Sequence, residues 1–81
     1  MFHERLKLIR ANSGLSQKDI SAKCEIGLRT LKYYESGRVN PTSDVIIKLC
    51  NYFNISADYL LGLTDEPRPL REEDTSNNQK Q

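Results

Sequence analysis

The chain is divided into short helical segments, and this division limits what it can fold into. Apolar residues recur at the spacing of a helix, but Gly14, Gly37 and Gly62 each follow such a segment and end it. We find no stretch that alternates apolar and polar residues as a strand would. We therefore expect an all-α domain of short helices packed around one small core.

Start and stop signals predict five helices. Ser16 caps the second helix, with Asp19 three residues later as the partner in a variant capping box. Thr42 or Ser43 caps the fourth helix, and Ser56 caps the fifth. The expected helices span residues 2–13, 17–24, 28–36, 44–53 and 57–61.

Apolar residues at helical spacing form the candidate core. They are Phe2, Leu6, Ile9, Ile20, Cys24, Ile26, Leu31, Tyr34, Val45, Ile46, Leu49, Cys50 and Phe53. Because Cys24 and Cys50 are far apart and His3 is the single histidine, we expect no disulfide, no metal site and no cofactor. A further group belongs either to the core or to a dimer surface, and the sequence leaves this open: Tyr52, Tyr59, Leu60, Leu61 and Leu63.

The 81 residues suit one domain followed by a tail. From Thr64 onward the composition is polar and charged, and Leu70 is the one large apolar side chain. Such a segment cannot bury enough apolar surface to offset the entropy lost on ordering. We expect a folded domain over residues 1–63 and a disordered tail over residues 64–81.

Charge is distributed unevenly along the chain. Residues 1–63 contain nine Lys or Arg and six Asp or Glu, whereas residues 64–81 contain three and five. A basic domain favours a polyanion partner. Since the chain starts with charged residues and has no apolar run of signal-peptide or membrane-spanning length, we expect a cytoplasmic protein without membrane contact. We expect no enzyme, because no carboxylate pair, second histidine or glycine-rich loop offers a catalytic site.

The third helix is the best candidate for the functional element. Its outer face mixes polar and aromatic residues, and a helix held out from a domain by a partner helix fits the major groove of DNA. Arg29 can bond guanine O6 and N7, Leu28 can touch a thymine methyl, and Tyr33 offers a hydroxyl and a ring. Phosphate contacts are expected from Thr30, Lys32 and Ser36. An alternative for Tyr33 with its neighbour Tyr34 is a small protein-binding patch.

Four motifs stand in order over residues 4–63: RLKLIR at 5–10, GLSQKDI at 14–20, YESG at 34–37 followed by NP at 40–41, and NISADYLLG at 54–62. Their order and spacing resemble the Cro/repressor-type helix-turn-helix family, also called the xenobiotic-response-element family. The resemblance implies a five-helix, lambda-repressor-like fold with the helix-turn-helix at the second and third helices. It also implies dimers that bind near-palindromic operator DNA.

The resemblance assigns roles to individual positions. Base reading is implied for Gly27, Leu28, Arg29 and Tyr33. Phosphate contact is implied for Gln17, where the start of the second helix can also meet a phosphate, and we extend it to the neighbouring Lys18. The loop after the third helix, with Ser36, Arg38 and Asn40, is the second backbone contact. Arg10 and Glu35 are expected to form a structural ion pair between the first and third helices.

Three positions depart from the family pattern. Glu25 stands where the turn between the second and third helices usually has Gly, at a penalty of about 1 kcal/mol, so we expect a slightly reshaped turn. Ser21 replaces a usual Ala, and we expect its hydroxyl to bond the carbonyl of Gln17. Gly27 replaces a capping Ser or Thr, which removes a side-chain contact.

The functional hypothesis is a sequence-specific transcriptional repressor or regulator that binds double-stranded DNA as a homodimer. Its half-sites are then roughly 34–36 Å apart, one helical turn of DNA. Alternatives of the same fold are an antitoxin or a restriction-modification controller protein. The tail favours the antitoxin, because a disordered segment can fold onto a protein partner. An alternative from another class is a protein-interaction module that has lost DNA binding.

Overall fold

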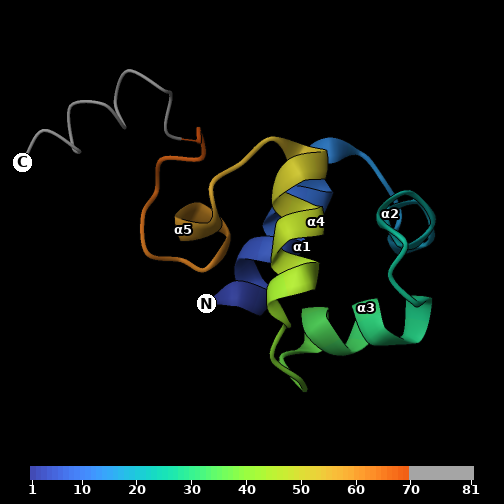
Figure 1. The fold of residues 1–81 in the computed structure, drawn as a ribbon. Helices are drawn as coiled ribbons and strands as arrows, with labels where there is room; N and C mark the ends of the chain where they lie inside the picture. The colour runs from blue at the N-terminus through green and yellow to red at the C-terminus, as the bar shows by residue number, and fades with distance from the viewer. Residues whose placement is uncertain (70–81) are drawn as a thin grey trace, which may run out of the picture.

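The computed structural model describes residues 1–69, and this part of the chain has five helices and no strand. The helices are α1 (Phe2–Ser13), α2 (Gln17–Cys24), α3 (Leu28–Ser36), α4 (Ser43–Phe53) and α5 (Ala57–Leu60) (Figure 1). The predicted all-α fold with five helices is confirmed. Small differences occur at two ends, because Ser43 is already helical and Leu61 follows α5 as its C-cap.

Local side-chain bonds set the helix starts. At α2 the Ser16 hydroxyl accepts from the Asp19 N–H at 3.0 Å, and the Asp19 carboxylate accepts from the Ser16 N–H at 3.1 Å. This is the predicted capping box. Of the two candidates before α4, Thr42 is the cap and accepts from the Val45 N–H at 3.2 Å. These bonds satisfy N–H groups that a helix start otherwise leaves unpaired.

One fully buried aliphatic side chain from each helix meets in the core. These side chains are Leu6, Ile20, Leu31, Leu49 and Leu60. A single core therefore holds all five helices together. It also answers part of the question left open by the sequence, since Leu60 is core, whereas Tyr52 is 41% exposed and Leu63 is 75% exposed.

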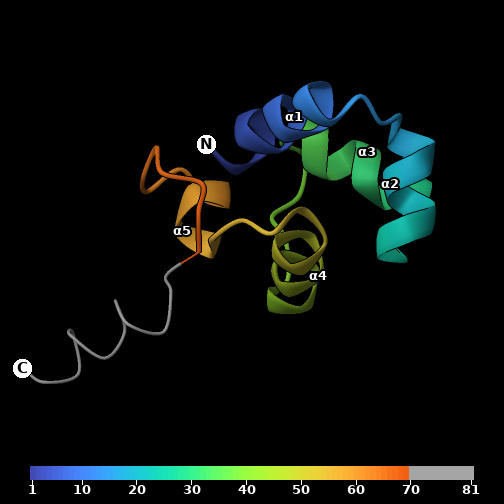
Figure 2. The same ribbon diagram turned by 90° about the horizontal axis from the view of Figure 1, so that it is seen from above.

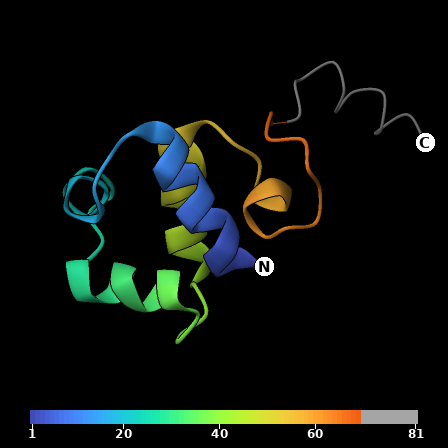
Figure 3. The same ribbon diagram turned by 180° about the vertical axis from the view of Figure 1, so that it is seen from behind.

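The helices surround this core in a fixed arrangement. α3 packs against α1 and α2, and α5 packs against α1 and α4. Seen from above, α2 and α5 lie at opposite ends of the molecule, and α1 and α4 lie on opposite sides between them (Figure 2). From behind, α1 crosses in front of α4 (Figure 3). α3 is thus held by α1 and α2 on its inner side, which leaves its other side uncovered by helices of the described chain.

The turn between α2 and α3 corrects two expectations. Glu25 adopts the left-handed conformation (φ 57°, ψ 46°), so the turn keeps the backbone geometry that Gly would provide and is not reshaped. The Ser21 hydroxyl donates to the carbonyl of Ile26, and not to that of Gln17. It therefore bonds across the turn instead of back along its own helix.

The segment after Leu63 contacts the domain. Arg5 of α1 forms an ion pair with Asp65 at 3.3 Å and stacks over the ring of Tyr59, with its guanidinium carbon 4.3 Å from the ring centroid. The N–H of Ser56 donates to the carbonyl of Pro67 at 2.9 Å. Asp65 and Pro67 therefore contact the helical domain, and the disorder expected from Thr64 stays a prediction. The same prediction for residues 70–81 lies outside the described residues.

Cys24 and Cys50 are free thiols, and burial raises the pKa of both. Both take part in the core, as expected from their helical spacing. Among the described helices, none has the length and apolar content needed to span a membrane.

Candidate nucleic-acid interface

The outer face of α3 presents the residues expected to read bases. Arg29, Thr30 and Lys32 are exposed, and Leu28 and Tyr33 are half-buried, whereas Leu31, Tyr34 and Glu35 face inward and are buried. Within residues 1–69, Arg29 and Lys32 form no ion pair. Their charges therefore face solvent and are available to an anionic partner.

Gly27 and the first turn of α3 form the end of this face that adjoins the α2–α3 turn. Gly27 is the N-cap, and it makes no side-chain capping bond, as expected from the loss of Ser or Thr. Its carbonyl accepts from the Leu31 N–H at 2.8 Å. Helix N-terminal residues are those that reach base edges in helix-turn-helix domains, so Leu28 and Arg29 occupy the favourable end.

Gln17 and Lys18 begin α2 directly after its cap. Because Ser16 takes the N–H of Asp19, the N–H groups of Gln17 and Lys18 are left without an acceptor among the described residues. The hydrogen bonds from the backbone and side chain of Ser16 hold the pKa of the Asp19 carboxyl below its ordinary value. Two free N–H groups at a helix start, together with the exposed cationic side chain of Lys18, favour a phosphate oxygen.

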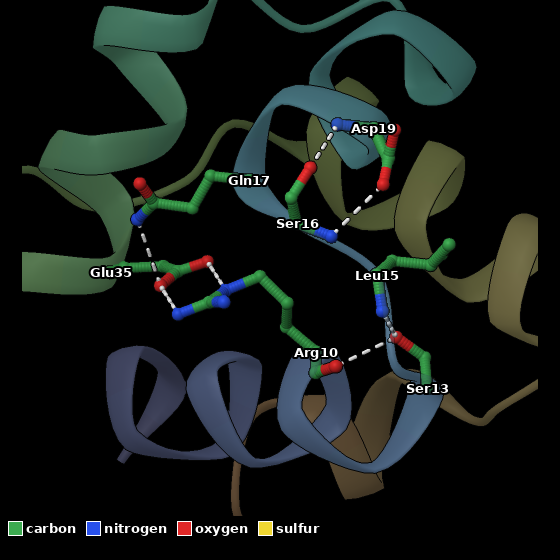
Figure 4. A network of polar contacts seen from close by, with 7 residues as sticks. All are labelled: Arg10, Ser13, Leu15, Ser16, Gln17, Asp19 and Glu35. Atoms are coloured by element: carbon green, nitrogen blue, oxygen red, sulfur yellow. Dashed lines mark hydrogen bonds and ion pairs between the residues drawn. The ribbon is translucent and has the colours of Figure 1, made fainter.

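A partly buried polar network connects α1, α2 and α3 (Figure 4). The Arg10 guanidinium donates to both carboxylate oxygens of Glu35, from Nε at 2.9 Å and from Nη2 at 3.1 Å. The Gln17 amide donates to Glu35 Oε1 at 3.1 Å. The Glu35 side chain is 4% exposed and the Arg10 side chain 28%. The expected Arg10–Glu35 pair is thus present, and Gln17 is a third member that sequence reasoning missed.

The loop after α3 carries the remaining candidates. Arg38 lies over the ring of Tyr33, with its guanidinium carbon 5.2 Å from the ring centroid, while Asn40 is exposed. The Ser36 hydroxyl donates to the carbonyl of Tyr33 at 2.9 Å, so its proton is directed at its own helix. The stacking of Arg38 on Tyr33 was not expected. An aromatic residue five positions before an Arg, across a glycine stop, is its only sequence signal.

The network brings the two expected phosphate-contacting groups together. Gln17 starts α2 and bonds Glu35, and Glu35 directly precedes Ser36 at the end of α3. Leu28 and Arg29, by contrast, lie at the opposite end of α3, roughly 12 Å away along its axis. Two base-reading candidates thus lie at the start of α3 and the phosphate candidate Ser36 at its end, whereas Thr30, Lys32 and Tyr33 lie between them.

The fold and this surface define a helix-turn-helix domain of the DNA-binding type. α2 and α3 pack against each other across a tight turn, and α3 is presented with free cationic side chains on its outer face. The helix-turn-helix domain family matches residues 3–66, and the chain belongs to this family. The family expected from the sequence motifs, the XRE type, is confirmed.

Several known proteins are similar to the chain. The HTH-type transcriptional regulator ImmR of Bacillus subtilis is 40% identical over 74 residues, which cover 91% of this chain and 58% of ImmR. YobD of the same organism, an uncharacterized HTH-type transcriptional regulator, is 32% identical over 69 residues, covering 85% of this chain and 62% of YobD. The chain thus spans about three fifths of each of these relatives.

A solved structure is also similar. The crystal structure of a transcriptional regulator from Listeria innocua matches with a TM-score of 0.71 and 29% sequence identity. The match covers 99% of this chain and 71% of the Listeria chain. The likeness supports the five-helix arrangement described above.

Proposed function

We propose that this domain binds double-stranded DNA at a specific sequence and represses or otherwise regulates transcription. The observation that carries the proposal is the outer face of α3, where Arg29 and Lys32 are exposed and unpaired among the described residues. The names of the relatives as transcriptional regulators support it, and they support no catalytic role. We therefore propose a regulator and not an enzyme.

In this proposal α3 enters the major groove and supplies the base contacts. The base-reading residues are Gly27, Leu28, Arg29 and Tyr33. Arg29 contributes most, because its guanidinium forms a bidentate pair with guanine that is worth about 1–3 kcal/mol of discrimination. The phosphate contacts come from Gln17, Lys18, Thr30, Lys32, Ser36, Arg38 and Asn40, and they fix the position of α3 without reading sequence.

We further propose a homodimer on a two-fold operator. A single exposed helix reads only a few base pairs, and a symmetric pair doubles the site when its half-sites lie roughly 34–36 Å apart. Met1 and Leu63, which are 65% and 75% exposed, are apolar surface on the α5 side of the domain and are available for such a contact. Sedimentation with and without operator tests this part, and a monomer at high micromolar concentration in both cases contradicts it.

The test of DNA binding compares matched variants on DNA from upstream of the protein's own gene. A footprint first locates the specific site. Arg29→Ala should then remove the preference for this site over unrelated DNA, with a loss of affinity of about 10-fold or more at the specific site. Lys18→Ala should weaken the affinity for all DNA sequences alike. It should also reduce the slope of log affinity against log salt concentration by about one unit. Lys7→Ala, which removes the same charge from an exposed position of α1 outside the proposed interface, is the control.

Gln17→Ala needs a separate control because Gln17 also bonds Glu35. Its thermal stability is measured beside its affinity, so that a loss of binding is not assigned to a loss of folding. A footprint without any protected site at modest salt contradicts the DNA-binding proposal. Capture of a protein partner that is insensitive to Arg29→Ala would instead favour the protein-interaction module.

A further inference from the structure

The first turn of α1 contacts the end of α3. One of the residues in this contact, His3, has no role in the proposed function. The ring of Phe2 meets the ring of Tyr34 edge to face, with centroids 6.1 Å apart and an interplanar angle of 83°. Next to it, the His3 ring lies against Gly37, the C-cap of α3. Helix α1 therefore supports both the last turn of α3 and the turn that follows it.

The contact between His3 and Gly37 is close and broad. A Cβ built on Gly37 would lie 3.2 Å from Nδ1, 3.3 Å from Cε1 and 3.3 Å from Cγ of His3. Three consecutive ring atoms at nearly equal distances mean that the imidazole presents its face to Gly37, not its edge. At such distances a side chain on residue 37 would press against the ring, and the left-handed backbone of Gly37 (φ 79°) further disfavours one.

The turn that His3 covers positions two of the proposed phosphate contacts. The N–H of Gly37 donates to the carbonyl of Tyr34 at 3.3 Å, and the N–H of Arg38 donates to the carbonyl of Tyr33 at 3.0 Å. These bonds fix the direction in which the chain leaves α3, and so the placement of Arg38 and Asn40. His3 itself is half-buried and forms no hydrogen bond within residues 1–69, so it acts on the turn through packing.

We propose that His3 is a positioning residue for DNA binding: its imidazole face packs on the Gly37 turn and holds Arg38 in place to contact a phosphate. This rests on the proposed DNA-binding function. A loop held in its bound conformation before association loses less entropy on binding, and a contact that fixes the turn therefore raises affinity without touching the ligand.

The test uses His3→Ala, which removes the ring, and His3→Phe, which keeps a flat ring but no ionisable nitrogen. Glu4→Gln is the matched control, because Glu4 is in the same turn of α1 and its side chain is 67% exposed. His3→Ala should weaken operator binding about five- to tenfold at a temperature where all variants are folded, and His3→Phe should restore it. Glu4→Gln should bind as the parent protein does.

A double-mutant cycle identifies the route of the effect. If His3 acts through the turn, most of the effect of His3→Ala should disappear in an Arg38→Ala background, because the main contact it positions is already gone. If the imidazole instead touches a phosphate directly, the two losses add and His3→Phe fails to restore binding. That result, or unchanged affinity of His3→Ala, overturns the proposal.

A measurement on the free protein separates this inference from the proposed function. Amide hydrogen exchange at Gly37 and Arg38 should be faster in His3→Ala than in the parent protein, with exchange at core positions such as Leu49 unchanged. Equal exchange at the turn in both proteins overturns the positioning role, whatever the affinities. Absence of DNA binding by the parent protein would contradict the proposed function alone, and the exchange result would still decide whether His3 holds the turn.

Discussion

The Arg10–Glu35–Gln17 network allows a stability prediction whose magnitude depends on which partner is removed. Glu35 is 4% exposed on its side chain, so Arg10→Met leaves a carboxylate in the interior with one neutral donor, the Gln17 amide. Removing one partner of a buried pair costs about 3–5 kcal/mol. Since the Arg10 side chain is 28% exposed and water can reach its place, we take the lower end, about 3 kcal/mol.

The opposite change strands no charge in the interior. In Glu35→Met the guanidinium of Arg10 turns to solvent, because part of its side chain is already exposed, and the loss should be about 1 kcal/mol for the missing hydrogen bonds. The double variant should lie close to the parent protein, since a buried pair replaced by apolar residues of similar size is often neutral. Methionine suits both positions because it favours helices and fills a similar volume.

Urea unfolding followed by circular dichroism measures the free energy of unfolding of all four proteins, and a thermal melt measures their midpoint temperatures. A domain of this size has a total stability of roughly 3–10 kcal/mol, so Arg10→Met should be visibly less stable at 25 °C, with its midpoint temperature lowered by roughly 12–24 °C. The reasoning is refuted if Arg10→Met loses less than Glu35→Met, or if the double variant is as unstable as Arg10→Met. Either result would mean that the carboxylate is not stranded when the guanidinium is absent.

Two further predictions concern local structure around α2. Glu25→Gly should raise the free energy of unfolding by about 0.5–1 kcal/mol, because relief of the left-handed strain exceeds the entropy that glycine loses on folding. Glu25→Ala should give no gain, because alanine keeps the strain. Thermal melts of the two variants test this. Asp19→Ala should lower the midpoint temperature at neutral pH, since the Ser16 hydrogen bonds that lower the pKa of Asp19 also stabilise α2. As its folded pKa lies below the ordinary 3.8, this stability is present above that pH and disappears as pH falls through the folded value. The difference between Asp19→Ala and the parent protein should therefore narrow below pH 3.8, and a constant difference down to the lowest pH would contradict it.

The helices were predictable from the sequence because their limits depend on short-range bonds. The Ser16 and Thr42 caps and the glycine stops at Gly14 and Gly37 act within three or four residues, so the sequence around each one contains the cause. The core was predictable for the same reason, since helical spacing alone places Ile20 and Leu31 inward. The choice between Thr42 and Ser43 was not, because both residue types are common helix caps and the structure uses the one with the weaker preference.

Contacts between distant residues were not predictable in this way. The stacking of Arg5 on Tyr59 and its pairing with Asp65 join parts of the chain far apart in sequence, and Asp65 belongs to a segment that looks like a tail by composition. The bond from Gln17 to Glu35 likewise depends on how α2 approaches α3. In the candidate site, residue types indicated which side chains can contact DNA. Only the packing of the helices determines which of these side chains already form hydrogen bonds or stack within the protein.

The turn at Glu25 shows how surrounding hydrogen bonds outweigh the conformational preference of a single residue. A left-handed Glu costs about 1 kcal/mol, which led us to expect a changed turn. However, the Ser21 carbonyl accepts the N–H of Ile26 at 3.0 Å, the Ser21 hydroxyl donates to the Ile26 carbonyl, and Lys48 of α4 donates to the Glu25 carbonyl at 3.4 Å. Bonds of this kind contribute about 1 kcal/mol each, so together they outweigh the strain. The serine that replaces the family's alanine thus supplies one of the bonds that let the turn do without its glycine.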